Sequence, residues 1–175
     1  MQKNTAKPLA LGLTVLGALA RLTPHPPNFA PVGGLSLFAG GRLRSWQAYL
    51  VPLALMAITD PLLGGYSFAT PFVYASLLIN VWIGSHLRAT ESPWRIGAAA
   101  AIGSFQFFVI TNFGTWLAPH GMYPHALAGL SVCYVNAIPF YGRTLLSDLC
   151  YSGALFGLYA WLSRRVAAEP KTVTA

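Results

Sequence analysis

Two long stretches of this chain carry no Asp, Glu, Lys or Arg: residues 96–142, a run of 47, and residues 61–87, a run of 27. A helix that crosses a lipid bilayer needs about 20 consecutive, mostly apolar residues, and both stretches exceed that length. Charged residues make up only 9% of the sequence, whereas soluble domains average about a quarter. The sequence therefore predicts a single all-α integral membrane domain over residues 1–175. It excludes a cytosolic enzyme, a disordered chain and a disulfide-rich secreted module.

The charged residues that remain are mostly basic and give a formal net charge of +7. In a soluble protein such an excess would indicate a nucleic-acid partner. Here the Lys and Arg residues lie between apolar runs and not along one face. We interpret them as topology signals, because cytoplasmic loops of membrane proteins are enriched in basic residues. We expect the lipid bilayer, and no nucleic acid, as a partner.

Proline and glycine clusters divide the chain into seven apolar segments. Helices are expected at about 7–22, 31–43, 45–64, 70–88, 94–117, 125–139 and 142–165. Residues 125–139 would span only about 22 Å as a helix, which is short of a hydrocarbon core of about 30 Å. The sequence thus predicts six transmembrane helices and an additional short outer-leaflet helix at 125–139 that is only partly inserted.

The positive-inside rule favours six crossings over seven. With six crossings and the N-terminus inside, nine Lys and Arg residues lie on the cytoplasmic side and two lie outside; with seven crossings the division is seven to four. The predicted location is therefore a bacterial inner (cytoplasmic) membrane. The chain is expected to be multi-pass, with both termini cytoplasmic.

Polar and aromatic residues concentrate at the predicted outer ends of the helices and in the outer loops. The candidate substrate-binding residues are His25, Asn28, Asp60, Asn112, Trp116, Tyr123, His125 and Asp148. Aromatic faces with a few polar groups line compact ligand pockets, although aromatic residues also form the belt at a membrane interface. Arg21 and Arg143, expected on the same side, are candidate charge partners or anion contacts. A carboxylate in an apolar helix needs a partner, so structural ion pairs with these arginines are the competing interpretation of Asp60 and Asp148.

The loop after the first predicted helix contains Pro24, Pro26 and Pro27. Proline fixes φ near −65° and removes backbone donors, so this loop would hold His25 and Asn28 on a stiff, extended turn. The loop is interpreted either as a wall of a binding site or as a plain connector that breaks the helix.

No constellation of catalytic residues is visible in the sequence. A Ser/His/Asp triad, a phosphate-binding loop and paired catalytic carboxylates are all missing, so we do not expect an enzyme. His120 and His125 have a spacing that two ligands of one metal ion could share, but no His-Glu-x-x-His motif or Cys/His cluster accompanies them. We therefore predict no bound metal and no cofactor.

A stripe of small residues lies on the first predicted helix, where Ala10, Thr14 and Ala18 recur every four residues. Small residues allow another helix to approach closely. The stripe packs either against the chain's own helices or against a partner membrane protein.

Several motifs, from the proline-rich loop at 21–32 to Asn112-Phe-Gly-Thr-Trp116 and Ala137-Ile-Pro-Phe140, resemble those of a family of small, uncharacterised bacterial membrane proteins described as transport proteins. That family is similar in layout to the substrate-binding S components of energy-coupling-factor (ECF) vitamin transporters. The resemblance covers about residues 9–165 and implies a six-helix bundle with a ligand pocket near the outer face. It also implies that the small-residue stripe on the first helix docks on a transmembrane coupling protein bound to two ATPase subunits.

The leading hypothesis is a substrate-binding membrane subunit for the uptake of a small organic micronutrient, a vitamin or a vitamin precursor. The alternative is an accessory or assembly subunit of a larger membrane complex, in which the outer polar residues form structural ion pairs. A membrane-embedded enzyme that uses Asp60 or Asp148 as an acid or base ranks third, because neither residue has a visible nucleophile beside it.

Overall fold

The computed structural model describes residues 3–88 and 90–168, so the predicted cytoplasmic termini, residues 1–2 and 169–175, lie outside the described residues. The elements are α1 (Lys3–Ala20), α2 (Val32–Arg42), α3 (Ser45–Thr59), the short 3-10 helix η1 (Asp60–Leu62), α4 (Thr70–Ser85), α5 (Pro93–Leu117) and α6 (Leu127–Ala168). No strand occurs in the described ranges, which confirms the all-α class.

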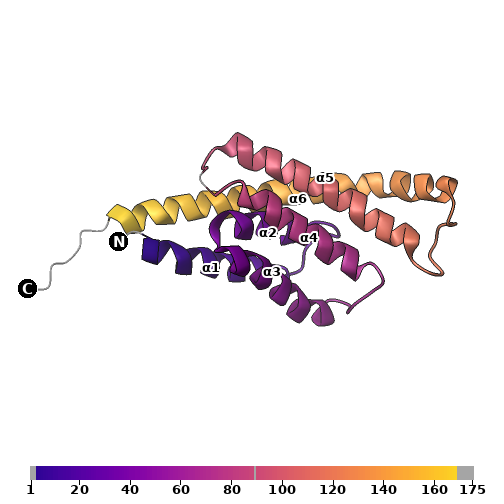
Figure 1. Ribbon diagram of the computed structural model, residues 1–175, viewed down its shortest axis with the longest axis horizontal. Helices are drawn as coiled ribbons and strands as arrows, with labels where there is room; N and C mark the ends of the chain where they lie inside the picture. The colour runs from indigo at the N-terminus through magenta and orange to yellow at the C-terminus, as the bar shows by residue number, and fades with distance from the viewer. Residues whose placement is uncertain (1–2, 89, 169–175) are drawn as a thin grey trace, which may run out of the picture.

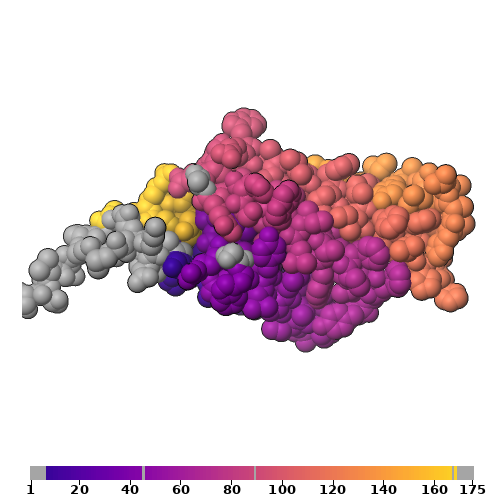
Figure 2. Space-filling model, viewed as in Figure 1, coloured from indigo at the N-terminus to yellow at the C-terminus, as the bar shows by residue number. Residues whose placement is uncertain are grey.

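The helices form an elongated bundle with two different ends (Figure 1). The start of α1 and the end of α6 lie at one end of the long axis, which we call the basal end. The loop between α5 and α6 lies at the other end, which we call the distal end. Figure 2 shows that the distal ends of α5 and α6 project beyond the other helices.

The last helix overturns one prediction. The sequence indicated two helices, at 125–139 and 142–165, but the structure has a single helix of 42 residues, α6, which runs through Pro139. A proline removes one backbone hydrogen bond, yet helices that pack on a neighbour tolerate it, and α6 packs on α5. At about 1.5 Å per residue α6 is roughly 63 Å long. Residues 125–139 are therefore not a separate short helix that dips into the outer leaflet.

Two of the described helices, α5 and α6, are long and apolar enough to cross a membrane. Only 28% of the apolar stretch of each is buried inside the protein, so they are not enclosed core helices. The apolar parts of α1 and α4, Lys7–Ala20 and Thr70–Ser85, are shorter, and the 11 residues of α2 span only about 16 Å. Helix lengths therefore do not support six crossings. Several predicted segments included loop residues; the segment 45–64, for example, leaves the α-helix after Thr59.

Large apolar side chains cover much of the outside of the bundle. Those at least half exposed include Trp46, Leu50, Ile58, Trp82, Trp94, Ile102, Phe105, Val135, Ile138 and Trp161. They lie on α3, α4, α5 and α6. Soluble monomers rarely expose contiguous apolar patches of more than a few hundred Å². A surface of this kind fits association with a membrane.

The short helix α2 forms the centre of the bundle. Its residues from Gly33 to Gly41 are all buried, and it contacts all five other α-helices (Figure 1). Glycine allows this packing: a Cβ on Gly40 would overlap the carbonyl oxygen of Val81, and a Cβ on Gly84 would overlap that of Leu37. The helices α2 and α4 thus approach backbone to backbone, as small residues allow between membrane helices.

Candidate functional site

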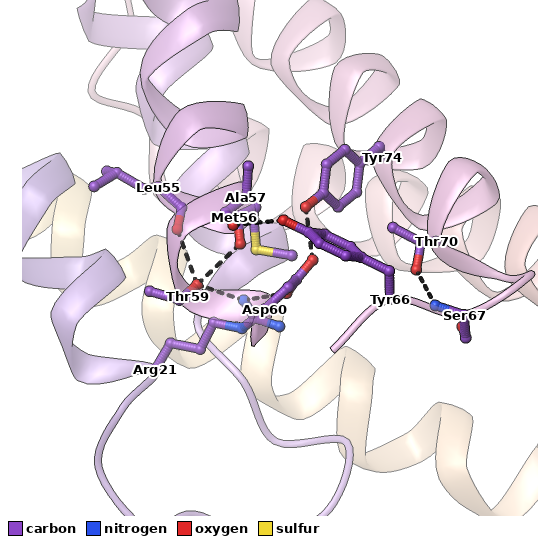
Figure 3. A network of polar contacts seen from close by, with 10 residues as sticks. All are labelled: Arg21, Leu55, Met56, Ala57, Thr59, Asp60, Tyr66, Ser67, Thr70 and Tyr74. Carbon is purple, nitrogen blue, oxygen red and sulfur yellow. Dashed lines mark hydrogen bonds and ion pairs between the residues drawn. The ribbon is translucent and has the colours of Figure 1, made fainter. Parts of the chain in front are cut away.

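Arg21 and Asp60 form an ion pair where the ends of α1 and α3 meet α4 (Figure 3). Arg21 Nη1 lies 2.6 Å from Asp60 Oδ1 and donates to Thr59 Oγ1 at 2.6 Å. The hydroxyl of Tyr74 on α4 donates to the other carboxylate oxygen, Oδ2, at 2.6 Å. Asp60 is only 8% exposed, and each of its carboxylate oxygens has a partner from a different segment.

This network joins the ends of three helices. The Thr59 hydroxyl donates to the carbonyl of Leu55 at 2.9 Å, and the Tyr66 hydroxyl donates to the carbonyl of Ala57 at 2.7 Å (Figure 3). The arrangement is that of the structural ion pair, the competing interpretation of Asp60. Each carboxylate oxygen already has a partner within the protein, so a ligand would find neither oxygen unpartnered.

Two adjoining cavities open between the proline-rich loop, α4, α5 and α6. The larger has a volume of about 340 Å³, and its polar lining consists of Asn28, Thr111, Asn112, Thr115, Tyr141 and Thr144. The smaller, of about 200 Å³, is lined by Asn28, Ala30, Val32, Gly33, Phe107, Thr144 and Asp148. Because Asn28, Phe107 and Thr144 line both, the cavities are two parts of one site. Three predicted substrate-binding residues, Asn28, Asn112 and Asp148, meet there.

Asn28 reaches the site from a turn of unusual backbone conformation. Its φ is +62°, in the left-handed region that Asn adopts more readily than most residues. The Ser147 hydroxyl of α6 donates to the carbonyl of Ala30 at 2.8 Å, and the rings of Phe29 and Tyr151 pack with centroids 5.9 Å apart. The proline-rich loop is therefore held against α6 as a wall of the cavity.

Asn112 is placed by its own helix. Its amide nitrogen donates to the carbonyl of Phe108, one turn earlier on α5, at 2.8 Å. The side chain therefore lies along α5 with its position fixed, on the side that faces the larger cavity.

Asp148 lies in the smaller cavity and is only 2% exposed. A Cβ on Gly33 would overlap its carboxylate, so the backbone of α2 packs directly on this group. Arg143, its predicted charge partner, is exposed, and neither of the two ion pairs found in residues 3–88 and 90–168 includes it. Helix geometry explains this: residues five apart on an α-helix point about 140° away from each other.

Trp116, Tyr123 and His125 lie together at the distal end. Trp116 Nε1 donates to the carbonyl of Pro124 at 3.0 Å, and the rings of Trp116 and His125 have centroids 5.7 Å apart. The Asn136 amide donates a long hydrogen bond of 3.5 Å to the Tyr123 hydroxyl. These predicted residues support the loop between α5 and α6 and line neither of the two adjoining cavities. Tyr123 instead lines a separate, more open cavity with Asn136.

The half-buried His25 also lines neither cavity. Among the described residues there is no group of three His, Cys, Asp or Glu side chains that could hold a metal ion.

The small-residue stripe on α1 faces inward. Ala10 and Thr14 are fully buried and Ala18 is 4% exposed, and the Thr14 hydroxyl donates to the carbonyl of Ala10 at 2.8 Å. Since α1 contacts α2, α3 and α6, the stripe packs against the chain's own helices. It offers no free surface to a docking partner.

Comparison with known proteins identifies a family. DUF6580, described as a family of unknown function, matches residues 1–171. The chain belongs to DUF6580. No curated protein and no solved structure matches it significantly. The match spans every helix of the bundle, so both cavities lie within the DUF6580 domain.

Sequence reasoning missed several cavity residues of this DUF6580 chain, among them Thr111, Thr144 and Phe107. Thr144 lies four residues before Asp148 on α6, and residues four apart share a helix face. That spacing was a usable signal for Thr144. Phe107 carried no such signal, because aromatic residues occur on every side of α5.

Proposed function

We propose that this DUF6580 protein is a membrane-embedded substrate-binding subunit for the uptake of a small organic micronutrient, such as a vitamin or a vitamin precursor. The observation that carries the proposal is the site made by the two cavities, which combines aromatic walls with amide and hydroxyl groups from the proline-rich loop, α5 and α6. A volume of a few hundred Å³ with a few convergent polar groups is typical of small-molecule sites. The rings of Phe108 and Tyr141, with centroids 5.1 Å apart, supply an apolar surface for the body of the ligand.

The proposal includes embedding of all six helices, with the basal end in the cytoplasm. Its support is the distribution of charge. Arg42 at the end of α2 donates to the carbonyl of Leu87 just after α4, and Arg164 near the end of α6 pairs with Glu91 just before α5. Basic residues from several helix ends thus lie together, as cytoplasmic ends do under the positive-inside rule. The helix α2 needs no crossing length of its own, because backbone enclosed by other helices does not meet lipid.

Uptake against a gradient needs an energy source outside this chain. The sequence has no phosphate-binding loop, so a partner would hydrolyse ATP. In ECF transporters, which the sequence resembles, a transmembrane coupling protein with ATPase subunits does this. The α1 stripe is buried, so such a partner would contact another face of the bundle.

A screen for ligands tests the proposal directly. The full chain is purified in detergent, and its melting temperature is measured against a panel of vitamins, vitamin precursors and corrinoids. A ligand at a hundred times its dissociation constant stabilises the native state by about 2.7 kcal/mol. We expect a saturable increase with one class of compound. No shift with any compound would contradict the proposal.

A pair of asparagine variants then locates the binding site. Asn112→Ala removes an amide from the larger cavity and should weaken binding of the identified compound by about 3- to 10-fold, the usual worth of one neutral hydrogen bond. Asn136→Ala changes an exposed residue that lines a separate cavity beside Tyr123 and neither of these two, so it should leave the affinity unchanged. If the identified compound binds both variants with the same affinity, this site is ruled out.

A second candidate is an accessory or assembly subunit, and one observation favours it. Gly153 and Gly157 lie four residues apart on an exposed part of α6, and a Cβ on either would meet no atom within 4 Å. Small residues at this spacing allow a partner helix to approach closely. Under this function Gly153→Leu should release a membrane protein that co-purifies with the unchanged chain, and Gly12→Leu should not. Co-purification that survives Gly153→Leu would count against it.

A further inference from the structure

One carboxylate faces the small-molecule site. Asp148 lines the smaller cavity beside Asn28 and Thr144, and its 2% exposure makes it the more deeply buried of the bundle's two aspartates. Neither cavity has a Lys, Arg or His in its lining, and neither ion pair of the described chain includes Asp148. The described part of the protein therefore supplies no cation to this carboxylate.

The groups packed around the carboxylate are neutral. The Ser104 hydroxyl and the backbone N–H of Gly34 face it, and Gly33 packs so closely that a Cβ there would overlap it. The Gly34 N–H belongs to the first turn of α2, where free backbone donors and the helix dipole offset part of a negative charge. None of these groups, however, carries a full positive charge that could pair with the carboxylate. A buried, ionised carboxylate costs several kcal/mol unless an opposite charge joins it. The cavity is the place from which such a charge can enter.

The remainder of the site suits an organic cation. Phe107 lines both cavities, and Phe108 and Tyr141 line the larger one. Aromatic faces attract ammonium groups through the ring quadrupole and also provide an apolar surface. A metal ion fits less well, because no group of three His, Cys, Asp or Glu side chains within the described ranges could hold one.

We infer that the ligand of this site carries a positively charged nitrogen, as a primary amine or a quaternary ammonium group, and that this nitrogen pairs with Asp148. The apolar body of the ligand lies against the aromatic wall, and Asn112 and Thr144 hydrogen-bond its other polar groups. This inference rests on the proposed function as a binding subunit, and it narrows the substrate class to small organic cations.

Two matched pairs of probes test the inference in the unchanged, full-length protein. Choline and 2-phenylethylamine carry the positive charge; 3,3-dimethylbutan-1-ol and 2-phenylethanol have nearly the same shapes and no charge. Dissociation constants are measured by titration calorimetry in detergent. We expect at least one cation to bind, and to bind ten times or more tighter than its neutral counterpart. Equal affinity within each pair, or no binding of either cation, overturns the inference.

A carboxylate variant then identifies the charged partner. Asp148→Asn keeps the shape of the side chain and removes its charge, so the preference for the cation should fall below about twofold. Glu91→Gln removes an exposed carboxylate at the basal end and should leave the preference intact. A preference that survives in Asp148→Asn overturns the assignment. The comparison of probes in the unchanged protein remains decisive if Asp148→Asn does not fold.

The outcomes separate this inference from the proposed function. A neutral or anionic micronutrient that binds the unchanged protein, and binds Asn112→Ala more weakly, would overturn the inference and uphold the proposed function. If no compound of the micronutrient panel or of the probe pairs binds, both are wrong.

Discussion

The guanidinium carbon of Arg42 lies 4.7 Å from the ring centroid of Phe156 and 5.3 Å from that of Tyr159. The same guanidinium donates to the carbonyl oxygens of Leu87 and Thr90, both at 2.8 Å. One side chain at the end of α2 therefore joins the central helix to α6 and to the segment between α4 and α5.

Arg42→Lys should lower the free energy of unfolding by about 1–3 kcal/mol, because an ammonium group cannot reproduce the two-armed donation or the flat stacking of a guanidinium. Arg95→Lys, at an exposed position on α5, should change it by less than about 0.5 kcal/mol. Thermal denaturation of both variants in one detergent checks this, and equal melting temperatures would contradict it.

Substitutions in the network around Asp60 should lower the free energy of unfolding by different amounts. Tyr74→Phe removes one hydrogen bond and should cost about 1 kcal/mol. Arg21→Met leaves the carboxylate without its cation and should cost more, up to about 3–5 kcal/mol, because the two side chains of the pair are only 17% and 10% exposed. Tyr66→Phe removes the hydrogen bond to Ala57 from a side chain that is 60% exposed, so it should cost the least of the three. The reverse order of melting temperatures would show that the ion pair does not stabilise the fold.

The close approach of α2 and α4 should not tolerate a methyl group. In Gly84→Ala the new Cβ overlaps the carbonyl oxygen of Leu37, so the helices must separate and the melting temperature should fall by several degrees. In Gly157→Ala the Cβ enters open space, and the change should be neutral or stabilising by up to about 1 kcal/mol, since alanine favours a helix. A folded Gly84→Ala variant with unchanged stability would disprove the backbone contact.

Labelling of engineered cysteines decides how many helices cross the membrane. In a variant whose Cys133 and Cys150 are replaced by alanine, Ser67→Cys probes the loop before α4 and Glu91→Cys probes the segment before α5. If all six helices are embedded, an impermeant thiol reagent should label Cys at 67 from outside the cell and Cys at 91 only after permeabilisation. If only α5 and α6 cross, both positions should behave alike.

Prolines mark the starts of α4 and α5, but Pro139 does not mark the end of a helix. Pro71 and Pro93 lie in the first turns of α4 and α5, where proline is favoured because the first N–H groups have no helical partner. The predicted starts at 70 and 94 were therefore close. Pro139 is the same residue type in the middle of α6. Whether such a proline ends a helix depends on packing against a neighbouring helix. The local sequence alone does not show that packing.

The residues of the candidate site were also predicted only in part. Asn28, Asn112 and Asp148 are polar residues in a stiff loop or in apolar runs, so each could be found on its own, and all three line the site. Trp116, Tyr123 and His125 were assigned to the same group because all were expected on the outer side. Tyr123 and His125 lie in the loop between α5 and α6, which the length of α6 places at the distal end (Figure 1). Trp116 directly follows the cavity residue Thr115, but its ring packs against Phe113 and His125 instead.

The enclosed position of α2 constrains how the chain matures during its synthesis. A Cβ on Gly34 would meet the backbone nitrogen of Ser152, and one on Gly41 would meet the ring of Phe156. These partners are made more than a hundred residues after α2 itself. The second helix therefore cannot complete its packing until α6 has been synthesised, and the glycine-rich surface that α6 covers stays open until then.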